Sequence, residues 1–371
     1  MHLRSSKWFQ LTAVSAAAAL PLTSLALEPA QAASTTVNVV GYSVVGPAYK
    51  ILEADFQATS AGAGVTFTNS FGASDTETNN VVAGQPADIV NLSYEPNLQT
   101  LVTAGRVAAN WASQELSVGG VNASLRLKKA QTTYRTPGIV TDSVVAFAVR
   151  PGNPLDIKNW GSLTKSGVQV VTPNPVTSGS ARWNLLAGYG AQIAIGRSPK
   201  QGQNYLKALL ANTVAQPTSG SAALAAFIAG TGNVLIDYED DIDAAIGAGD
   251  QLQIVTPPQT LLIENPIALT DTGVTNSSAV AFYQYLFSTP GQTALASLGY
   301  RSVLKGVWAS TEGKFASFKK STDLITVESL GGWPAVNLEF FSPAVVFPAN
   351  NTTYPKFGIV TYLEKFAGST A

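Results

Sequence analysis

The chain of 371 residues has no cysteine and a single histidine, His2. Without cysteine it can form neither a disulfide nor a thiolate nucleophile, and it cannot be anchored as a lipoprotein. The remainder of the chain lacks the imidazole that Ser-His catalysis and the common zinc sites require. An enzyme would have to work with carboxylates, Lys, Tyr or Ser alone. We therefore expect a protein that is not an enzyme and that holds no metal and no cofactor.

Charged residues are also scarce. They make up 12% of the chain, with 22 Lys and Arg against 23 Asp and Glu, whereas about a quarter of an average globular protein is charged. A nucleic acid would find no basic field on such a chain, so no nucleic-acid partner is expected. Any anion that the protein binds must be small and must be held by local geometry.

The first 32 residues have the order of a secretory signal peptide. The basic residues Arg4 and Lys7 precede the apolar run 11–27, and the cleavage-type sequence AQA follows at 30–32. The alternative is a membrane anchor, but the apolar core is shorter than the ~20 residues that span a bilayer. We therefore expect removal of residues 1–32 and an exported protein in the periplasm that is not a lipoprotein.

Segments with the periodicity of strands alternate with segments of helical periodicity, which favours α/β architecture with parallel strand pairing. In the first part of the chain, strands are predicted at 36–40, 65–69 and 88–92, and helices at 49–56 and 75–83. Further on, strands are predicted at 168–172, 234–237 and 252–256, and helices at 181–189, 205–211, 221–229, 280–287 and 291–298.

The length of the chain exceeds the usual size of one domain and suggests two lobes. The continuous apolar run 143–149, which ends at a Pro- and Gly-rich turn, is predicted to cross between them as a hinge strand. We expect one lobe of residues 33–145 and 265–371, including the C-terminal tail, and a second lobe of residues 146–264. Each lobe should be a mainly parallel sheet flanked by helices. The tail aromatics beyond Lys314 are interpreted as packing residues.

Ser and Gly residues open three predicted helices. Ser74 with Glu77 matches a capping box, and the segments 177–183 and 217–221 carry similar Ser/Gly starts. Helix N-termini have unpaired N–H groups and a partial positive charge, so several that face one point can hold an anion without a basic side chain. The alternative is that each is an ordinary cap, because Ser, Thr and Gly open most helices.

The segment 171–184, VTPNPVTSGSARWN, resembles VTPNPKTSGGARWN of the periplasmic sulfate- and thiosulfate-binding proteins of ABC importers. Other segments that resemble this family, in the same order along the chain, lie at 70–74, 87–90, 149–154, 232–236, 288–292 and 331–333. The resemblance implies the type II periplasmic-binding-protein fold, in which two lobes close on a ligand. It also implies capture of a sulfate-type oxyanion, the membrane subunits of an ABC permease as partner, and a monomer.

Position by position, the resemblance implies that the ligand is held by neutral donors at Ser74, Ser178, Gly179, Ser180, Gly220 and Tyr238. Three positions depart from the family's pattern. Ser180 replaces a glycine, Tyr238 replaces the pocket tryptophan, and Asp75 replaces a glycine directly after the contact serine. These departures bear on the identity of the ligand more than on the fold.

Asp75 keeps a phosphate alternative open. Sulfate carries no proton at neutral pH, so a carboxylate facing it would repel it, whereas phosphate keeps a proton that a carboxylate can accept. The other interpretation is that Asp75 is the first helical residue and points away into solvent. Arg182 is expected to make a supporting salt bridge rather than a ligand contact. A hydrolase of sulfate or phosphate esters is the least favoured alternative.

An acidic cluster follows the strand predicted at 234–237. Its members are Asp237, Glu239, Asp240, Asp241 and Asp243. The cluster lacks the glycine and the terminal glutamate of a calcium-binding loop. We therefore expect a solvated corner between strand and helix.

Overall fold

The computed structural model describes residues 36–114, 128–129, 132–133, 138–320, 322–343 and 358–366. The predicted signal peptide and the aromatic residues between 344 and 357 lie outside these residues. The described residues all belong to one compact unit, and the predicted lobe boundaries within it stay a prediction. In the described ranges, no helix has both the length and the apolar character needed to cross a membrane.

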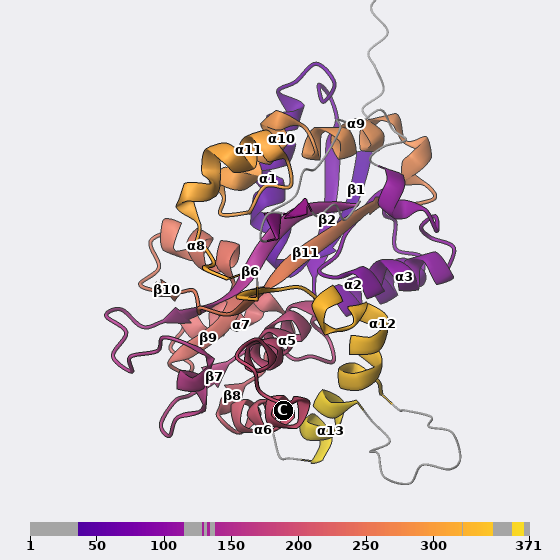
Figure 1. The fold of residues 1–371 in the computed structure, drawn as a ribbon. Helices are drawn as coiled ribbons and strands as arrows, with labels where there is room; N and C mark the ends of the chain where they lie inside the picture. The colour runs from indigo at the N-terminus through magenta and orange to yellow at the C-terminus, as the bar shows by residue number, and fades with distance from the viewer. Residues whose placement is uncertain are drawn as a thin grey trace, which may run out of the picture. The chain divides into compact units, whose positions relative to one another are not determined.

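A 10-stranded sheet with the order β2-β1-β3-β11-β6-β9-β7-β8 runs through this unit (Figure 1). A first parallel group of strands consists of β2 (Thr66–Gly72), β1 (Thr36–Tyr42) and β3 (Ile89–Asn91). A second parallel group consists of β9 (Val234–Tyr238), β7 (Val170–Val171) and β8 (Thr213–Ala215). The predicted parallel pairing is confirmed within each group.

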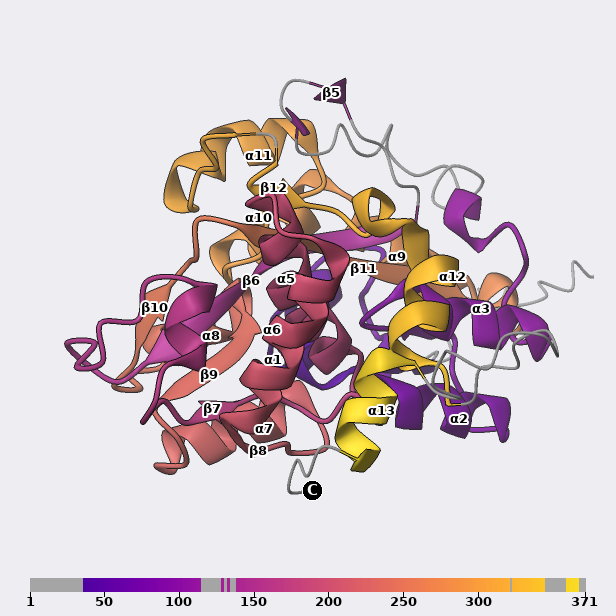
Figure 2. The same cartoon turned by 60° about the horizontal axis from the view of Figure 1, so that its bottom comes forward.

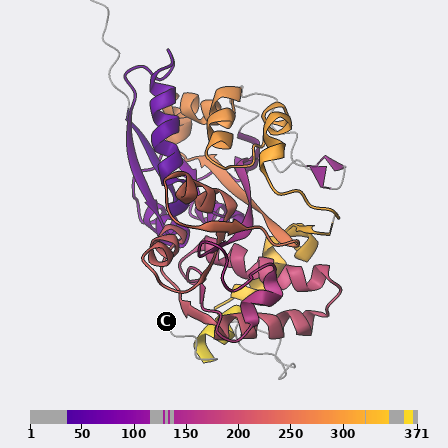
Figure 3. The same ribbon diagram turned by 90° about the vertical axis from the view of Figure 1, so that its left-hand side faces the viewer.

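Two long antiparallel strands join the groups. β6 (Ile139–Val149) and β11 (Thr260–Leu269) lie side by side between them (Figure 3), and every residue of β6 is buried. β6 contains the predicted hinge segment, whereas no strand was predicted at the position of β11. The β6–β11 register shifts between Asn265 and Pro266, as expected where proline cannot donate to the ladder. Two further short strands complete the sheet: β10 (Gln253–Val255) pairs with β6, and β12 (Leu324–Ile325) pairs with β11.

Helices accompany both groups, and most begin within a few residues of their predicted positions. With the first group lie α1 (Gly46–Gln57), α2 (Ser74–Val82), α3 (Glu95–Thr103), α9 (Ser277–Leu286) and α10 (Thr289–Ser297). With the second lie α5 (Gly179–Ala194), α6 (Pro199–Ala211), α7 (Gly220–Ile228) and α8 (Glu239–Gly247). The remaining short elements include α11 (Lys305–Thr311) and a two-stranded sheet of β4 (Lys128–Lys129) and β5 (Thr132–Thr133).

Local sequence explains where these helices start and how they are held. Ser198 and Gln201 form a reciprocal capping box at the start of α6, with Pro199 at the first helical position. Phe282 of α9 packs on Phe67 of β2, with ring centroids 4.7 Å apart, and on Phe56 of α1 at 5.2 Å. These aromatic contacts fix α1 and α9 against the first parallel group.

The C-terminal segment returns to the second group. After β12 it continues through α12 (Gly332–Val336), the π-helical turn η7 (Asn337–Phe341) and α13 (Ile359–Phe366). Figure 2 shows α13 in yellow, and it contacts α6. Phe340 is buried against Tyr189, with ring centroids 4.7 Å apart. This tail aromatic is therefore a packing residue, as predicted.

A buried ion pair fixes the start of α8 to the segment after α10. Arg301 Nε lies 2.7 Å from a carboxylate oxygen of Glu239, and the two side chains are 3% and 4% exposed. The guanidinium group also lies 5.0 Å from the centre of the Phe315 ring. Such a pair is costly to break, because the remaining charge is left unpaired and away from water.

We expect Glu239→Ala to lower the free energy of unfolding by about 3–5 kcal/mol, as measured by urea denaturation. The matched control is Asp156→Ala, which removes an exposed pair with Lys158 at 2.7 Å and should cost less than about 1 kcal/mol. Equal losses for the two variants would contradict the role given to the buried pair.

Candidate functional site

The predicted ligand residues lie where parallel strands end and helices begin. In the first group, Ser74 opens α2 after β2. In the second, Ser178 and Gly179 lead into α5 after β7, Gly220 opens α7 after β8, and Tyr238 ends β9. The carboxyl ends of parallel strands are the common place for ligands in open α/β sheets.

Ser74 does not form the predicted capping box. The N-cap position of α2 is Ala73, and the Ser74 hydroxyl oxygen instead accepts a hydrogen bond from the backbone N–H of Ser93 at 3.0 Å. The Glu77 carboxylate accepts from the Ser70 hydroxyl. The prediction was wrong because a buried N–H from the segment after β3 takes the serine oxygen. The hydroxyl proton of Ser74 stays available for donation.

Gly179 brings the second group against the first. A Cβ atom at this position would overlap the Ser93 hydroxyl oxygen and would lie 2.5 Å from Cδ1 of Tyr94. A glycine is therefore required for the start of α5 to approach the segment that follows β3. Ser178, which precedes it at the N-cap, is buried and makes no side-chain capping bond.

Ser180, Gly220 and Tyr238, the other three predicted residues, lie beside the contact that Gly179 makes. A Cβ atom on Gly220 would lie 3.2 Å from the Ser180 hydroxyl oxygen. Burial raises the pKa of Tyr238 well above its usual value, and the nearby Ser180 hydroxyl and Asn265 amide offset part of this. Tyr238 therefore keeps its proton at neutral pH and can donate it. The structure thus gathers the six predicted donors in one buried cluster, and their contact with a ligand stays a prediction.

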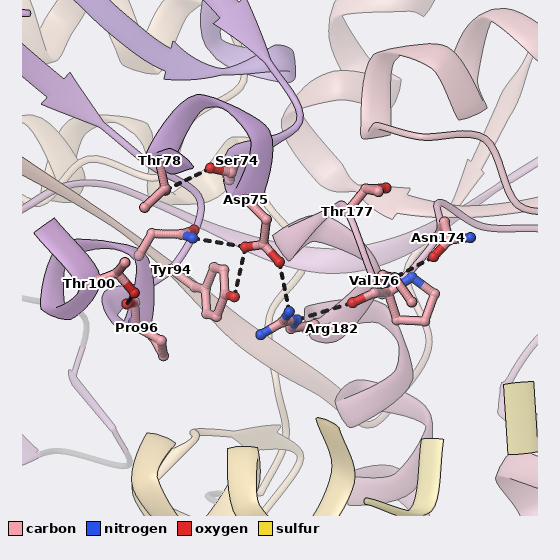
Figure 4. Close-up of polar contacts among 12 residues, drawn as sticks. Ser74, Asp75, Thr78, Tyr94, Pro96, Thr100, Asn174, Val176, Thr177 and Arg182 are labelled. Atoms are coloured by element: carbon pink, nitrogen blue, oxygen red, sulfur yellow. Dashed lines mark hydrogen bonds and ion pairs between the residues drawn. The ribbon is translucent and has the colours of Figure 1, made fainter. Parts of the chain in front are cut away.

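Asp75 neither points into solvent nor is free to face a ligand. Its carboxylate accepts hydrogen bonds from the Tyr94 hydroxyl at 2.9 Å and the Asn97 amide at 2.8 Å, and it pairs with Arg182 Nη2 at 2.7 Å (Figure 4). The expectation of a solvated side chain was wrong because partners distant in sequence surround the carboxylate. Arg182 makes the expected supporting salt bridge.

The acidic corner at the start of α8 is buried, so the prediction of a solvated corner was wrong. α8 packs on β6, and the Glu239 carboxylate forms an ion pair with Arg301. Burial raises the pKa of Asp240 to about 8 and that of Asp241 to about 7. At neutral pH Asp240 therefore holds its proton most of the time and Asp241 about half of the time, which reduces the negative charge close to Tyr238. Among the described residues, no group of His, Cys, Asp or Glu could hold a metal ion.

Ser43, Ser93 and Asn265 lie beside the donor cluster, although the sequence analysis did not single them out. Ser43 accepts a hydrogen bond from the N–H of Ser221 at 3.3 Å. The carbonyl of Ser93 accepts from the indole N–H of Trp183 at 2.7 Å and from the amide of Asn265 at 3.1 Å, while its hydroxyl is buried and makes no hydrogen bond to a described residue. Ser43 and Ser93 follow β1 and β3, and that position was the available signal.

The cluster offers hydrogen-bond donors at the N-termini of α2, α5 and α7 rather than an activated nucleophile. Such donors suit an anion that is held and released. Together with the two parallel groups joined by β6 and β11, they define the class: a binding protein with the type II periplasmic-binding-protein fold.

Comparison with known proteins agrees with this class. A sequence profile of the bacterial extracellular solute-binding proteins matches residues 37–301, and the chain belongs to that family. It is 32% identical to the sulfate-binding protein of Synechococcus elongatus, over 82% of this chain and 83% of that one. It is 29% identical to the thiosulfate-binding protein of Pseudomonas aeruginosa, over 89% and 96%. The solved sulfate-binding protein SubI of Mycobacterium tuberculosis superposes with a TM-score of 0.74 at 36% identity, over 83% and 100%.

The buried acids predict how stability depends on pH. Asp240 keeps its proton up to about pH 8 in the folded chain but ionises near pH ~4 when unfolded. Between these values the folded state holds the extra proton, so the free energy of unfolding should fall by about 1.4 kcal/mol per pH unit for this group. Urea denaturation at three values between about pH 5.5 and 7.5 measures the slope.

The variant Asp240→Asn cannot ionise, so its slope should be smaller than that of the wild type. Asp271→Asn changes an exposed aspartate and should leave the slope as it is. An unchanged slope in Asp240→Asn would show that Asp240 is ionised in the folded protein.

Proposed function

We propose that the protein captures sulfate, or the closely related thiosulfate, outside the cytoplasm and delivers it to an ABC importer. The anion lies among Ser74, Ser178, Gly179, Ser180, Gly220 and Tyr238. It is held by backbone N–H groups at helix starts and by serine and tyrosine hydroxyls. The protein works as a monomer in the periplasm, catalyses no reaction and needs no cofactor.

The observation that carries this proposal is the convergence of uncharged donors from both parallel groups. The start of α2 and the start of α5 meet through Ser93, which bonds Ser74 and touches Gly179. A fully deprotonated oxyanion only accepts hydrogen bonds, so a site made of donors suits it. Aligned peptide dipoles make the burial of its charge tolerable.

The contacts of Asp75 count against phosphate. A carboxylate that selects phosphate must accept the proton that phosphate retains. Both oxygens of Asp75 already accept from protein donors, Oδ1 from Tyr94 and Asn97 and Oδ2 from Arg182. The named relatives support the same choice, because they are sulfate- and thiosulfate-binding proteins.

Delivery follows from the way such a site closes. Donors contributed by both groups surround the anion only when the groups face one another, so ligand binding favours that arrangement. A surface made by both groups together then distinguishes loaded from empty protein. We propose that the membrane subunits of an ABC permease bind that surface.

Isothermal titration of the purified protein with sulfate, thiosulfate, phosphate and molybdate tests the proposal. Sulfate or thiosulfate should bind at least about tenfold more tightly than phosphate, a difference of about 1.4 kcal/mol. Ser74→Asp places a carboxylate among the donors and should abolish binding by repulsion. Phosphate as the tightest ligand would overturn the choice of anion, and turnover of a sulfate or phosphate ester would overturn the assignment as a binding protein.

Gly179→Ala should weaken sulfate binding by at least about tenfold, because its Cβ forces the start of α5 away from Ser93 and Tyr94. Gly306→Ala is the matched control, since its Cβ would meet no atom within 4 Å. Thermal unfolding without ligand shows whether each variant folds. Wild-type affinity in a folded Gly179→Ala variant would contradict the close approach described here.

A further inference from the structure

Three buried carboxyl groups adjoin Tyr238, the proposed ligand donor at the end of β9. Asp237 precedes Tyr238 in the chain, and Asp240 and Asp241 lie in the first turn of α8. Their exposed fractions are 0%, 1% and 8%. Asp237 Oδ1 accepts a hydrogen bond from the N–H of Tyr238 at 2.9 Å. The three acids are therefore close neighbours of the donor cluster and are shielded from water.

In their ionised forms these acids leave several oxygens without a partner. Asp237 Oδ2, Asp241 Oδ2 and both oxygens of Asp240 are buried and make no hydrogen bond to a described residue. The hydroxyl oxygen of Ser143 on β6, a neighbour of Asp240, is in the same state. The side chains of Asp237 and Asp241 lie within hydrogen-bonding reach of each other. Burial of ionised oxygens without donors is costly, so this arrangement calls for a further donor.

Protons supply the missing donors. A proton on either acid of the Asp237–Asp241 pair turns two facing acceptors into a donor and an acceptor, and a proton on Asp240 gives that carboxyl group a donor as well. Burial raises the pKa of Asp240 to about 8 and that of Asp241 to about 7, and it also raises the pKa of Asp237. The three acids can therefore exchange protons close to neutral pH.

A cavity gives the acids access to solvent. It has a volume of about 530 Å³ and lies between α1, α8 and the end of α10. Asp240 and Asp241 line it, and none of the six proposed ligand donors does. Protons can therefore reach the acids without passing through the donor cluster.

We propose that Asp237, Asp240 and Asp241 form a proton-binding site that fills when the anion binds, so that the protein captures sulfate together with a proton. The inference rests on the proposed function, which places the anion at Tyr238. The proton comes from the solvent and binds to a carboxylate oxygen. Charges on Asp237 and Asp240 act on the Tyr238 hydroxyl, and they repel an anion bound by that hydroxyl in the same way. The bound dianion in turn favours the protonated acids, because such coupling is reciprocal.

Other charged or titratable groups pack around these three acids. Glu239 and Arg301 pair with each other. Asp243 is partly exposed, and burial raises its pKa only to about 6. The remaining groups are Tyr42 on β1 and Tyr300 after α10, whose pKa values burial raises well above 10, Asp142 on β6, and Lys314 in the cavity wall. All of them stay in place in the variants described below, so a pH dependence of their own would persist there.

The sign of the effect follows from proton linkage. Sulfate itself carries no proton near neutral pH, so a change in its affinity reports on the protein. Below about pH 6 the three acids are protonated with and without the anion, and the affinity should be constant. As the pH rises through about 7 and 8, the empty protein loses protons that binding must recover. Uptake of about half a proton lowers the association constant about threefold per pH unit.

The first experiment measures the affinity of the mature protein for radiolabelled sulfate by equilibrium dialysis at about pH 6, 7, 8 and 9 and constant ionic strength. The dissociation constant of the wild type should rise at least about tenfold over this range. The triple variant Asp237→Asn, Asp240→Asn, Asp241→Asn cannot ionise at these positions and should stay within about twofold. Asp271→Asn changes an exposed aspartate and should keep the wild-type dependence.

Thermal unfolding shows whether the triple variant folds. If it does not, Asp240→Asn alone and the pair Asp237→Asn, Asp241→Asn should each reduce the pH dependence of binding. Calorimetric titration of the wild type with sulfate at about pH 7.5, in two buffers of different ionisation enthalpy, counts the protons directly. It should show uptake of at least about 0.3 proton per anion bound.

A wild-type dissociation constant within about twofold from pH 6 to 9, or binding without proton uptake, would overturn the proton site. The full wild-type pH dependence in the folded triple variant would also overturn it. If the wild type binds no sulfate at any pH, the proposed function fails, and carbon-13 NMR of the aspartate carboxyl groups decides on the acids. Carboxyl signals of the wild type should then titrate above about pH 6.5 and be absent from the Asn variants. A wild type without such signals would show that the three acids hold no exchangeable proton.

Discussion

The approach of the start of α5 to the segment after β3 is the constraint on which the site depends. Gly179 has no side chain, so the backbone there lies directly against Ser93 and Tyr94. Ser93 in turn bonds Ser74 through its N–H and Trp183 through its carbonyl. One close contact therefore sets the spacing between donors from the two parallel groups. A bulkier residue at this position would push the start of α5 away from Ser93 and so increase the distance between the donors of the two groups.

The electrostatics around this contact follow one pattern. Arg182, in the helix that Gly179 opens, is paired with Asp75, and Arg301 is paired with Glu239, which follows Tyr238. The buried Asp240 holds its proton at neutral pH because burial disfavours its charge. Full charges are thereby balanced or suppressed close to the donors. The local field is then set by peptide dipoles and hydroxyl groups, which suits a small anion held without a counter-charge.

The sequence predicted the alternating elements and the donor-bearing helix starts well, because both leave local patterns. Contacts between distant segments left no such pattern. Asp75 and Arg182 are 107 residues apart, and nothing local shows that they meet. The capping box predicted at Ser74 does not form, because the Ser74 hydroxyl oxygen accepts a hydrogen bond from the backbone N–H of Ser93. The acidic corner was misjudged because its burial depends on the packing of α8 against β6, whereas composition alone favours solvent.

The break in the β6–β11 ladder at Pro266 bears on how the two groups can move. Proline has no N–H to donate, so the β6–β11 ladder that joins the groups lacks one backbone hydrogen bond there. The neighbouring Asn265 accepts from Tyr42 of β1 and donates to Ser93. The Asn265 side chain thereby connects this part of the ladder to Ser93, whose N–H bonds Ser74 in the donor cluster. One amide side chain thus connects β1, the interrupted part of the ladder and the segment after β3, so a change in the sheet beside Pro266 would reach Ser93 directly through Asn265.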